Sequence, residues 1–379
     1  MYWEEEKGEG EGWLKDDCHL IVPGEPPAWT PPTHTRKLHP DSGEYVKDQD
    51  ASRYPEYPLE PIIQVVLVEQ PDFAFQDRDI VGCGHSLSHL LGFLCGDDKS
   101  FRVLVGTVGK TVFLIRRENS PAETIQGVRG YGHTFPEAYT TWGPDVKRSA
   151  SHQRIMNYEF AGMKILVRFG SDGYLPGRVP ADENSERQQP PKEDTGTVEP
   201  TDTEAKAKTL RVEKGGRDIP QCAVFDIRTR SARYEDPNIL ETMLFRLWIS
   251  QIPNFILAHH TFGVFDGIRI LDVREKVQEW EETNQALLSK FGLLLKKIIS
   301  FAQASELGRF EVFHKEGESS LELRAQTGNV SRALPADVAA RWTSKEDHTS
   351  PTWIPRPGRR VQSLRDWESC GMFLEGSAM

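Results

Sequence analysis

Two carboxylates at helical spacing are the first candidates for an active site. Asp272 and Glu275 form a D-x-x-E sequence at the start of a stretch with helical periodicity. The i, i+3 spacing places them on neighbouring positions, turned away from the apolar stripe that begins at Val273. Such a pair could bind a cation or act as general acid and base. The same pattern also forms a capping box at a helix N-terminus, where the helix dipole favours acids. The two interpretations are compatible.

A second group of charged residues lies on segments with strand-like patterns. In the sequence FDIRTR, residues 225–230, strand alternation puts Asp226, Arg228 and Arg230 on one face. Asp226 and Arg228 could form a surface ion pair or line a polar cleft. Asp172 follows another strand-like run and precedes a glycine, so it is either a turn residue or a functional carboxylate at a strand end.

A third group lies in a segment rich in glycine and aromatic residues, GYGHTFPEAYTTW, residues 130–142. It brings His133, Glu137, Tyr139 and Trp142 into a stretch with little periodicity. Loops of this kind often present functional groups. The alternative is a structural loop whose aromatic side chains cover the core.

The charge distribution bounds the class of partner. The net charge of -11 argues against a non-specific nucleic-acid binder. Residues 101–170 nevertheless hold 10 Lys and Arg against 5 Asp and Glu. That excess could form a phosphate-binding face or simply a solvated sheet surface.

Several kinds of site and location are not indicated. The five cysteines form no CxxC pair, which disfavours a zinc site or a disulfide framework and favours a reducing, cytoplasmic location. The acidic N-terminus lacks the apolar region of a secretory signal, and no apolar run could span a membrane. The sequence contains no Walker A, GxSxG, GxGxxG or HExxH motif, so no cofactor is expected and no metal ligands are assigned.

The pattern of elements predicts one mixed α/β domain over residues 58–342. Strands are expected at 61–68, 221–230, 309–314 and 320–324, and hairpins at 101–117, 153–169 and 255–271. Helices are expected after Ser86, over 238–251 and over 272–305. Residues 1–57, 176–218 and 343–379 are rich in Pro, Gly and acidic residues, which predicts a disordered arm, a disordered insertion and a polar tail.

These residues give the chain two family resemblances. It resembles the eukaryotic decapping exonucleases, a branch of the PD-(D/E)xK nuclease fold, whose motifs are a glutamate, then E-x-D, then E-x-K. Glu137 would match the first acid, Asp172 the aspartate of E-x-D, and Asp226 with Arg228 the E-x-K. Gly170 stands where an acid is expected and Arg228 replaces the lysine. This set is one carboxylate short for a site with two metal ions, and arginine cannot carry protons near neutral pH.

The chain also resembles a fungal family of arginine-containing cyclodipeptide synthases. That likeness rests on VGCGHSLSHLL, FRVLVGTVGKTVFLIRRENSP, GYGHTFPEAYTTW, SHQRIMNY, VFDIRTRSARY, LWISQIPNFILAHHT and the DVRE tetrad. It implies a transferase that joins arginyl-tRNA and a second aminoacyl-tRNA into a diketopiperazine for secondary metabolism. The DXXE motif is associated with activity in that family.

The synthase resemblance gives each candidate residue a role. It implies catalytic carboxylates at Asp272, Glu275, Glu137 and Asp172, and substrate binding by Asp226, Arg228, Tyr139 and Trp142. A carboxylate pocket is suited to hold a guanidinium in a bidentate pair. Transfer RNA would bind the basic face through Arg116, Arg117, Lys147, Arg148 and Arg154. The alternatives are an RNA nuclease or decapping-like hydrolase, and a non-catalytic RNA-binding protein on a degenerate nuclease fold.

Overall fold

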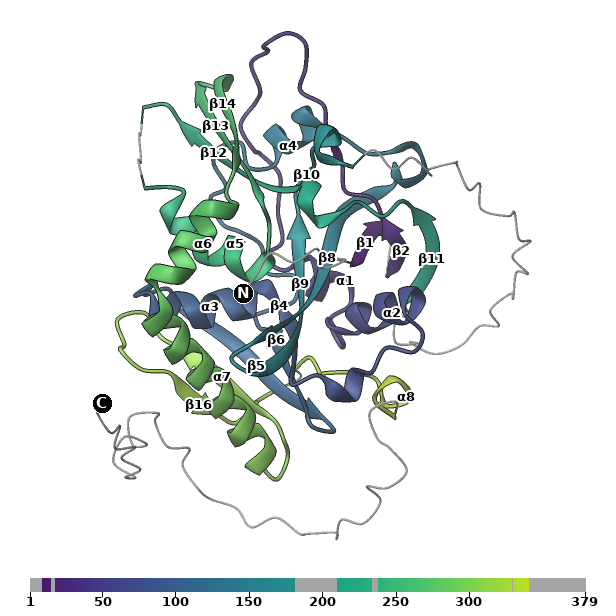
Figure 1. The fold of residues 1–379 in the computed structure, drawn as a ribbon, viewed down its shortest axis with the longest axis vertical. Coiled ribbons are helices and arrows are strands. Elements are labelled where there is room, and N and C mark those ends of the chain that lie inside the picture. The colour runs from purple at the N-terminus through teal and green to yellow at the C-terminus, as the bar shows by residue number, and fades with distance from the viewer. Residues whose placement is uncertain (1–8, 15–17, 181–209, 234–237, 329, 341–379) are drawn as a thin grey trace, which may run out of the picture.

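A ten-stranded mixed sheet forms the centre of the molecule (Figure 1). The computed structural model describes residues 9–14, 18–180, 210–233, 238–328 and 330–340. The strand order is β11-β2-β1-β8-β9-β4-β6-β5-β15-β16. The strands are β1 (Glu9–Leu14), β2 (His19–Gly24), β4 (Ile80–Cys83), β5 (Phe101–Val108), β6 (Thr111–Arg116), β8 (Ser149–Phe160), β9 (Met163–Ser171), β11 (Arg211–Gly216), β15 (Phe310–His314) and β16 (Glu322–Arg324).

A smaller sheet of six strands continues from the end of β9, in the order β14-β13-β12-β10-β3-β7. Its strands are β3 (Ala28–Trp29), β7 (Thr140–Thr141), β10 (Gly173–Tyr174), β12 (Val224–Ser231), β13 (Asn254–Thr261) and β14 (Val264–Asp272). Between β9 and β10 the chain passes from the large sheet to the small one, and the single residue Asp172 separates the two strands. That crossing places Asp172 at the junction of the two sheets.

Helices cover both faces of the large sheet, as the alternation of buried side chains requires. Val103 and Val105 belong to one apolar core with helices α3, α5 and α7, whereas Leu104 belongs to a second core with α2 and α8. The helices are α1 (Gln49–Arg53), α2 (Glu60–Glu69), α3 (Gly84–Leu94), α4 (Thr134–Tyr139), α5 (Leu244–Ser250), α6 (Arg274–Thr283), α7 (Gln285–Ala304) and α8 (Ala336–Ala339). None of the helices in the described ranges is long and apolar enough to cross a membrane.

The predicted mixed α/β class is confirmed, together with most of its elements. The three predicted hairpins form as β5–β6, β8–β9 and β13–β14, and β12, β15 and β16 lie where strands are expected. The long helix expected over 272–305 is two helices, α6 and α7, which meet at Asn284. The Asn284 side-chain amide and its backbone N–H both donate to the carbonyl of Trp280, at 2.8 and 3.0 Å, so Asn284 satisfies the end of α6 at the break.

The strand predicted over 61–68 is wrong, because these residues form α2. A run of isoleucine and valine favours a strand by propensity. Here Pro61 lies in the first helical turn, which tolerates proline, and Ile62, Ile63, Val65 and Val66 are all fully buried. Burial on most sides of one helix therefore overrides the intrinsic preference.

The predicted boundaries need correction at the N-terminus. Residues 1–57 do not form a disordered arm throughout, because β1 pairs with both β2 and β8 inside the large sheet. The expected insertion over 176–218 ends in strand β11, which pairs in parallel with β2. Its central part, 181–209, and the expected tail, 343–379, lie outside the described residues.

Candidate functional site

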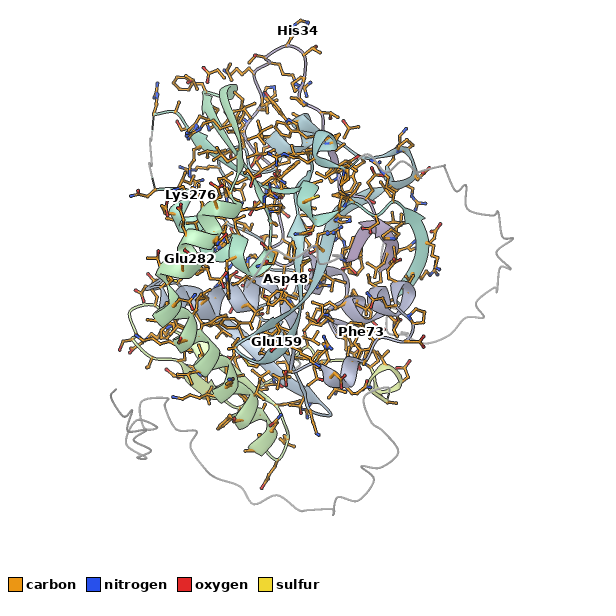
Figure 2. The ribbon with its side chains drawn as sticks, viewed as in Figure 1. His34, Asp48, Phe73, Glu159, Lys276 and Glu282 are labelled. Atoms are coloured by element: carbon orange, nitrogen blue, oxygen red, sulfur yellow. The ribbon has the colours of Figure 1, made fainter. Side chains whose placement is uncertain are left out.

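A polar pocket of about 380 Å³ lies where the two sheets meet. Its walls come from the end of β9, from β12, from the first turn of α3, from α5 and from residues 47–50. The side chains that face it include Asp172, Asp226, Arg228, His85, Arg116 and Arg246. Figure 2 shows Asp48, which also lines the pocket, near the middle of the molecule. The pocket therefore gathers both signs of charge in one enclosed space.

Asp172 and Asp226 face one another across the sheet junction. The approach is close because Gly173 lies against β12, where a Cβ atom would be 2.5 Å from the ring of Phe225 and from the Pro27 carbonyl. Asp172 Oδ2 accepts a hydrogen bond from the backbone N–H of Ile227 at 2.7 Å. Burial raises the pKa of Asp172, and the charge of Asp226 and a hydrogen bond between the two carboxyl groups raise it further. The pair thus holds a proton that isolated aspartates would release.

Arg228 is the cation nearest to this pair. Its Nη1 lies 3.5 Å from Asp226 Oδ1 and donates to the carbonyl of Ile227 at 3.0 Å. The predicted alternation on β12 holds, because Phe225 and Ile227 are buried on the opposite face. The neighbouring Asp226 charge raises the pKa of Arg228 in spite of burial. The guanidinium therefore stays charged inside the pocket.

Arg246 and His85 complete the site, and the sequence did not single them out. Arg246 lies on α5, its Nε is buried without a hydrogen-bond partner, and burial and then Arg228 lower its pKa. His85 lies in the first turn of α3 and opens onto the pocket. Burial, followed by Arg116, His89, Arg246 and Arg228, lowers the pKa of His85. An arginine inside the apolar run LFRLWIS is the one sequence signal that could have indicated this part of the site.

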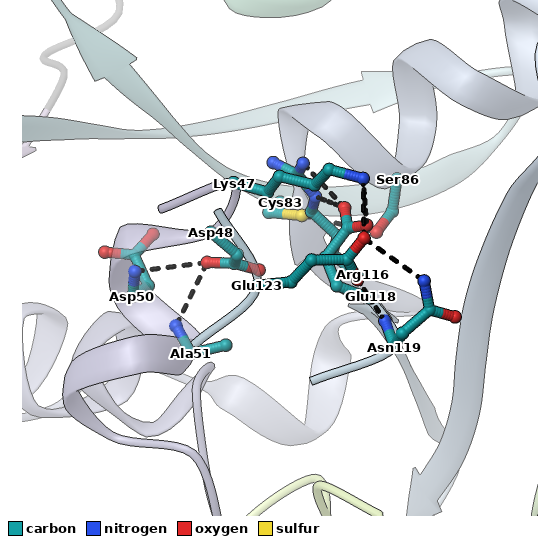
Figure 3. Close-up of polar contacts among 10 residues, drawn as sticks. All are labelled: Lys47, Asp48, Asp50, Ala51, Cys83, Ser86, Arg116, Glu118, Asn119 and Glu123. Carbon is teal, nitrogen blue, oxygen red and sulfur yellow. Dashed lines mark hydrogen bonds and ion pairs between the residues drawn. The ribbon is translucent and has the colours of Figure 1, made fainter. Parts of the chain in front are cut away.

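A network of ion pairs forms one rim of the pocket (Figure 3). Lys47 Nζ lies 2.8 Å from Glu123 Oε1, and Arg116 Nη2 lies 2.7 Å from Glu118 Oε1. The Lys47 hydrogen bond lowers the pKa of Glu123 to about 2, with further hydrogen bonds from Asn119. Asp48 caps α1 by accepting from the backbone N–H groups of Asp50 and Ala51. This network ties the segment before α1 to the segment after β6.

Deeper in the pocket, a buried ion pair joins the N-terminal strand to β9. Arg168 Nη1 lies 3.4 Å from Glu11 Oε1, and Arg168 Nη2 lies 2.9 Å from Asp50 Oδ2. Glu11 and Arg168 are almost fully enclosed. Burial raises the pKa of Glu11 to about 7, and Arg168 only partly opposes the increase.

The D-x-x-E residues lie outside the pocket. Asp272 ends β14 and pairs with Arg274 at 2.6 Å and with Arg178 at 2.9 Å. Its Oδ1 also accepts from the backbone N–H of Arg274, but the N-cap residue is Val273, so the predicted capping box does not form. Glu275 is exposed in the first turn of α6. Figure 2 shows Lys276 and Glu282 of the same helix pointing away from the centre of the molecule.

The segment 130–142 contributes packing more than polar groups. Glu137 is exposed on α4 and does not line the pocket, so it does not join Asp172. Tyr139 is buried in an aromatic cluster with Trp29, Phe135 and Phe265. Trp142 packs beside Val146 and two residues of β1 and β2. The interpretation of these aromatic residues as core cover therefore fits their positions.

The five basic residues predicted to contact transfer RNA are dispersed. Arg116 lines the pocket, whereas Arg117 pairs with Glu311 on β15. Lys147 and Arg148 are exposed in the turn before β8. Arg154 is fully buried, with its Nε donating to Gln221 at 3.2 Å. The basic excess of residues 101–170 thus does not form one continuous face.

Comparison with known proteins places the fold. A family model described as "Domain of unknown function (DUF8563)" matches residues 13–340. No curated protein sequence matches the chain. Rai1 of S. pombe has a similar structure, with a TM-score of 0.56 and 11% identity over 86% of this chain and 94% of that one. Rai1 of Scheffersomyces stipitis, solved with (3'-NADP)+ and a calcium ion, gives 0.56 and 9% over 89% and 95%.

These structural neighbours correct the functional prediction. They are decapping exonucleases, so the fold resemblance to that family is confirmed. The predicted cyclodipeptide synthase, with its tRNA-dependent transfer and diketopiperazine product, is wrong. The roles that this synthase would have given to Asp272, Glu275 and Glu137 no longer have a basis. The resemblance had relied on short runs of sequence, whereas the fold match spans most of both chains.

The pocket does not fit the divalent cation bound in the S. stipitis structure. Calcium takes six to eight oxygen ligands, with carboxylates carrying most of the charge. In the parts of the chain that the structure describes, no group of three or more His, Cys, Asp or Glu side chains is placed to hold a metal ion. Burial and the neighbouring Asp226 raise the pKa of Asp172, and the Arg228 Nη1 lies 3.5 Å from Asp226 Oδ1, so neither carboxyl group is a free anionic ligand.

Proposed function

The chain belongs to the DUF8563 family, and we propose that it binds RNA and that its pocket at the sheet junction holds a phosphate group of that RNA. The observation that carries the proposal is the guanidinium of Arg246. Within the described residues it pairs with no carboxylate, and its Nε is buried without a partner. Arg246 is half-buried, so its guanidinium has lost part of its hydration, and a phosphate would compensate for that loss with charge-assisted hydrogen bonds.

The neighbouring groups suit a phosphate as well. Arg228 and Arg116 add charge to the same pocket, and the pocket also includes Gly84, the first residue of α3. The residue before it, Cys83, gives α3 no side-chain cap. Uncapped N–H groups at a helix N-terminus favour an anion. Structures of S. pombe Rai1 with 3'-FADP and of S. stipitis Rai1 with (3'-NADP)+ provide examples of nucleotide ligands on this fold.

A second cavity favours single-stranded RNA over a single nucleotide as the ligand. It has a volume of about 1070 Å³ and shares Asp172 and Arg228 with the pocket. Arg129 and Arg230 line it and are exposed, and the half-buried ring of His260 also lines it. Arginines can neutralise backbone phosphates while aromatic rings stack on bases. Because the two cavities share Asp172 and Arg228, we propose that a single RNA strand extends from one cavity into the other.

RNA binding is tested directly by fluorescence anisotropy. A short single-stranded RNA with a 5'-phosphate is titrated with the wild-type protein and with Arg246→Met, which keeps most of the side-chain length. We expect Arg246→Met to weaken binding by about 10-fold or more, as for loss of a charge-assisted contact. Arg269→Met is the matched control, because Arg269 is exposed on β14 and lines neither cavity. Equal affinity for both variants would contradict the proposal.

Metal-dependent RNA hydrolysis is the second candidate, favoured by the fold and by the Asp172 and Asp226 pair. Two carboxylates that face one another in a pocket could take part in such chemistry. The missing acid at Gly170 and the guanidinium of Arg228 count against it. Release of labelled nucleotides in Mn²⁺ or Mg²⁺, and its loss in Asp172→Asn, would favour hydrolysis.

A further inference from the structure

We propose that this pocket holds its phosphate ligand without a divalent ion, and that the Arg228 guanidinium supplies the positive charge beside Asp172 and Asp226. The inference rests on the proposed function, which it makes more specific. The ligand class is a nucleic-acid phosphate bound by arginine side chains alone. Three observations in the described part of the chain support it, and each concerns a different atom group.

The first observation is the state of the two carboxyl groups. Burial, followed by the neighbouring Asp226 carboxyl group, raises the pKa of Asp172 to about 8, so this carboxyl group favours its protonated form near neutral pH. One oxygen of Asp172 is also taken by the N–H of Ile227. A divalent ion would have to displace the proton of Asp172 before it could use both carboxylates. In the folded protein the pair therefore carries about one negative charge rather than two.

The second observation is the place of Arg228. Its Nη1 is 3.5 Å from Asp226 Oδ1. The charge of Asp226 raises the pKa of Arg228, burial opposes that increase, and Asp172 adds to it. The strand holds the side chain there, because Arg228 is two residues from Asp226 on the same face of β12. A permanent cation at this position neutralises the acid pair and repels a metal ion. It can still donate its remaining N–H groups to a phosphate.

The third observation is the unused space at Gly170. A Cβ atom there would meet only Gln153 Oε1, at 3.8 Å. Gly170 is also not among the glycines with positive φ, so the backbone does not require glycine. A Cβ atom therefore fits at Gly170 on the wall of the pocket without a close contact, and the chain does not provide a carboxylate there. Neither space nor strain explains its absence.

The experiment measures RNA affinity and Mn²⁺ uptake in parallel. Wild-type protein is titrated with 5'-phosphorylated RNA in EDTA and in Mn²⁺ at about 1 mM. Free Mn²⁺ is followed by electron paramagnetic resonance. We expect the two RNA affinities to agree within about 2-fold and no stoichiometric Mn²⁺ uptake. The double variant Gly170→Asp with Arg228→Lys should take up Mn²⁺ at least about 10-fold more tightly. Gly170→Asn with Arg228→Lys is the matched control, since it adds the same volume without the charge.

The outcomes separate this inference from the proposed function. RNA binding that requires Mn²⁺ and is lost in EDTA would overturn the inference and leave RNA binding in place. Stoichiometric Mn²⁺ uptake by the wild type would overturn it as well. Absence of RNA binding in either buffer would overturn the proposed function. Circular dichroism of both double variants checks that they fold. If the variants that carry Arg228→Lys do not fold, Gly170→Asp alone provides the Mn²⁺ measurement.

Discussion

Arg168 and Glu11 form an ion pair that connects two distant parts of the chain within the core. Arg168 lies on β9 and Glu11 on β1, and their exposed fractions are 2% and 0% for the side chains. Arg168 also donates to the Pro58 carbonyl at 2.9 Å. Arg168 lines the pocket at the sheet junction, so β1 supports one of its walls through this pair.

Removal of Arg168 should destabilise the protein more than removal of Glu11. Arg168→Met leaves Glu11 and Asp50 enclosed without their cation, and we expect a loss of about 3–5 kcal/mol in the free energy of unfolding. Urea denaturation of Arg168→Met, Glu11→Gln and the double variant measures it. The double variant should lose less than the sum of the two single variants, because the residues are coupled. Additive losses would show that the pair makes no net interaction.

The pH dependence of stability should identify Glu11. Its pKa is about 7 in the folded protein, against an ordinary value of 4.5. The folded state therefore binds this proton more tightly than the unfolded state, and the resulting stability is complete below pH 4.5 and is lost as the pH rises through 7. We expect a decrease of about 3 kcal/mol across that interval. Urea midpoints between pH 4.5 and 8 should decrease less in Glu11→Gln, and parallel curves would contradict the assignment.

The place of β1 shows why part of the fold could not be predicted from the sequence. EGEGWL has little apolar alternation, and β1 pairs both with β2, the next strand along the chain, and with the distant strand β8. Gly10 is a consequence of that packing, because a Cβ atom would be 2.8 Å from the Pro23 carbonyl. Amino-acid composition indicates only how polar a segment is on average. It therefore cannot reveal a strand that is stabilised mainly by pairing with its neighbours.

The candidate site was predictable where strand alternation determines it. Asp226 and Arg228 share a face of β12, and Asp172 follows β9, as the spacing indicated. Arg246 and His85 come from helices that reach the pocket only through tertiary packing, and no local period reports that. Glu137 and the D-x-x-E residues had suitable types and spacing, but their elements point elsewhere.

The salt dependence of RNA binding should show whether the RNA occupies the second cavity. Arg129 and Arg230 line it, and each should neutralise one phosphate of a single strand. The slope of log affinity against log salt concentration should decrease by about 1.4 in Arg129→Met with Arg230→Met, at about 0.7 for each contact. Anisotropy titrations at several salt concentrations measure it. An unchanged slope would place the strand elsewhere on the surface.

Loss of the D-x-x-E carboxylates should leave RNA binding intact. Asp272 pairs with Arg274 and Arg178 near the surface, and Glu275 is exposed, so neither reaches the pocket. The hydrogen bonds from Arg274 and Arg178 hold the pKa of the Asp272 carboxyl below its usual range, although these exposed pairs stabilise proteins little. We expect Asp272→Ala with Glu275→Ala to lower the free energy of unfolding by about 1 kcal/mol or less. Its RNA affinity should match that of the wild type, whereas Arg246→Met should weaken binding in the same assay. A loss of affinity with an unchanged urea midpoint would instead give these two residues a role in binding.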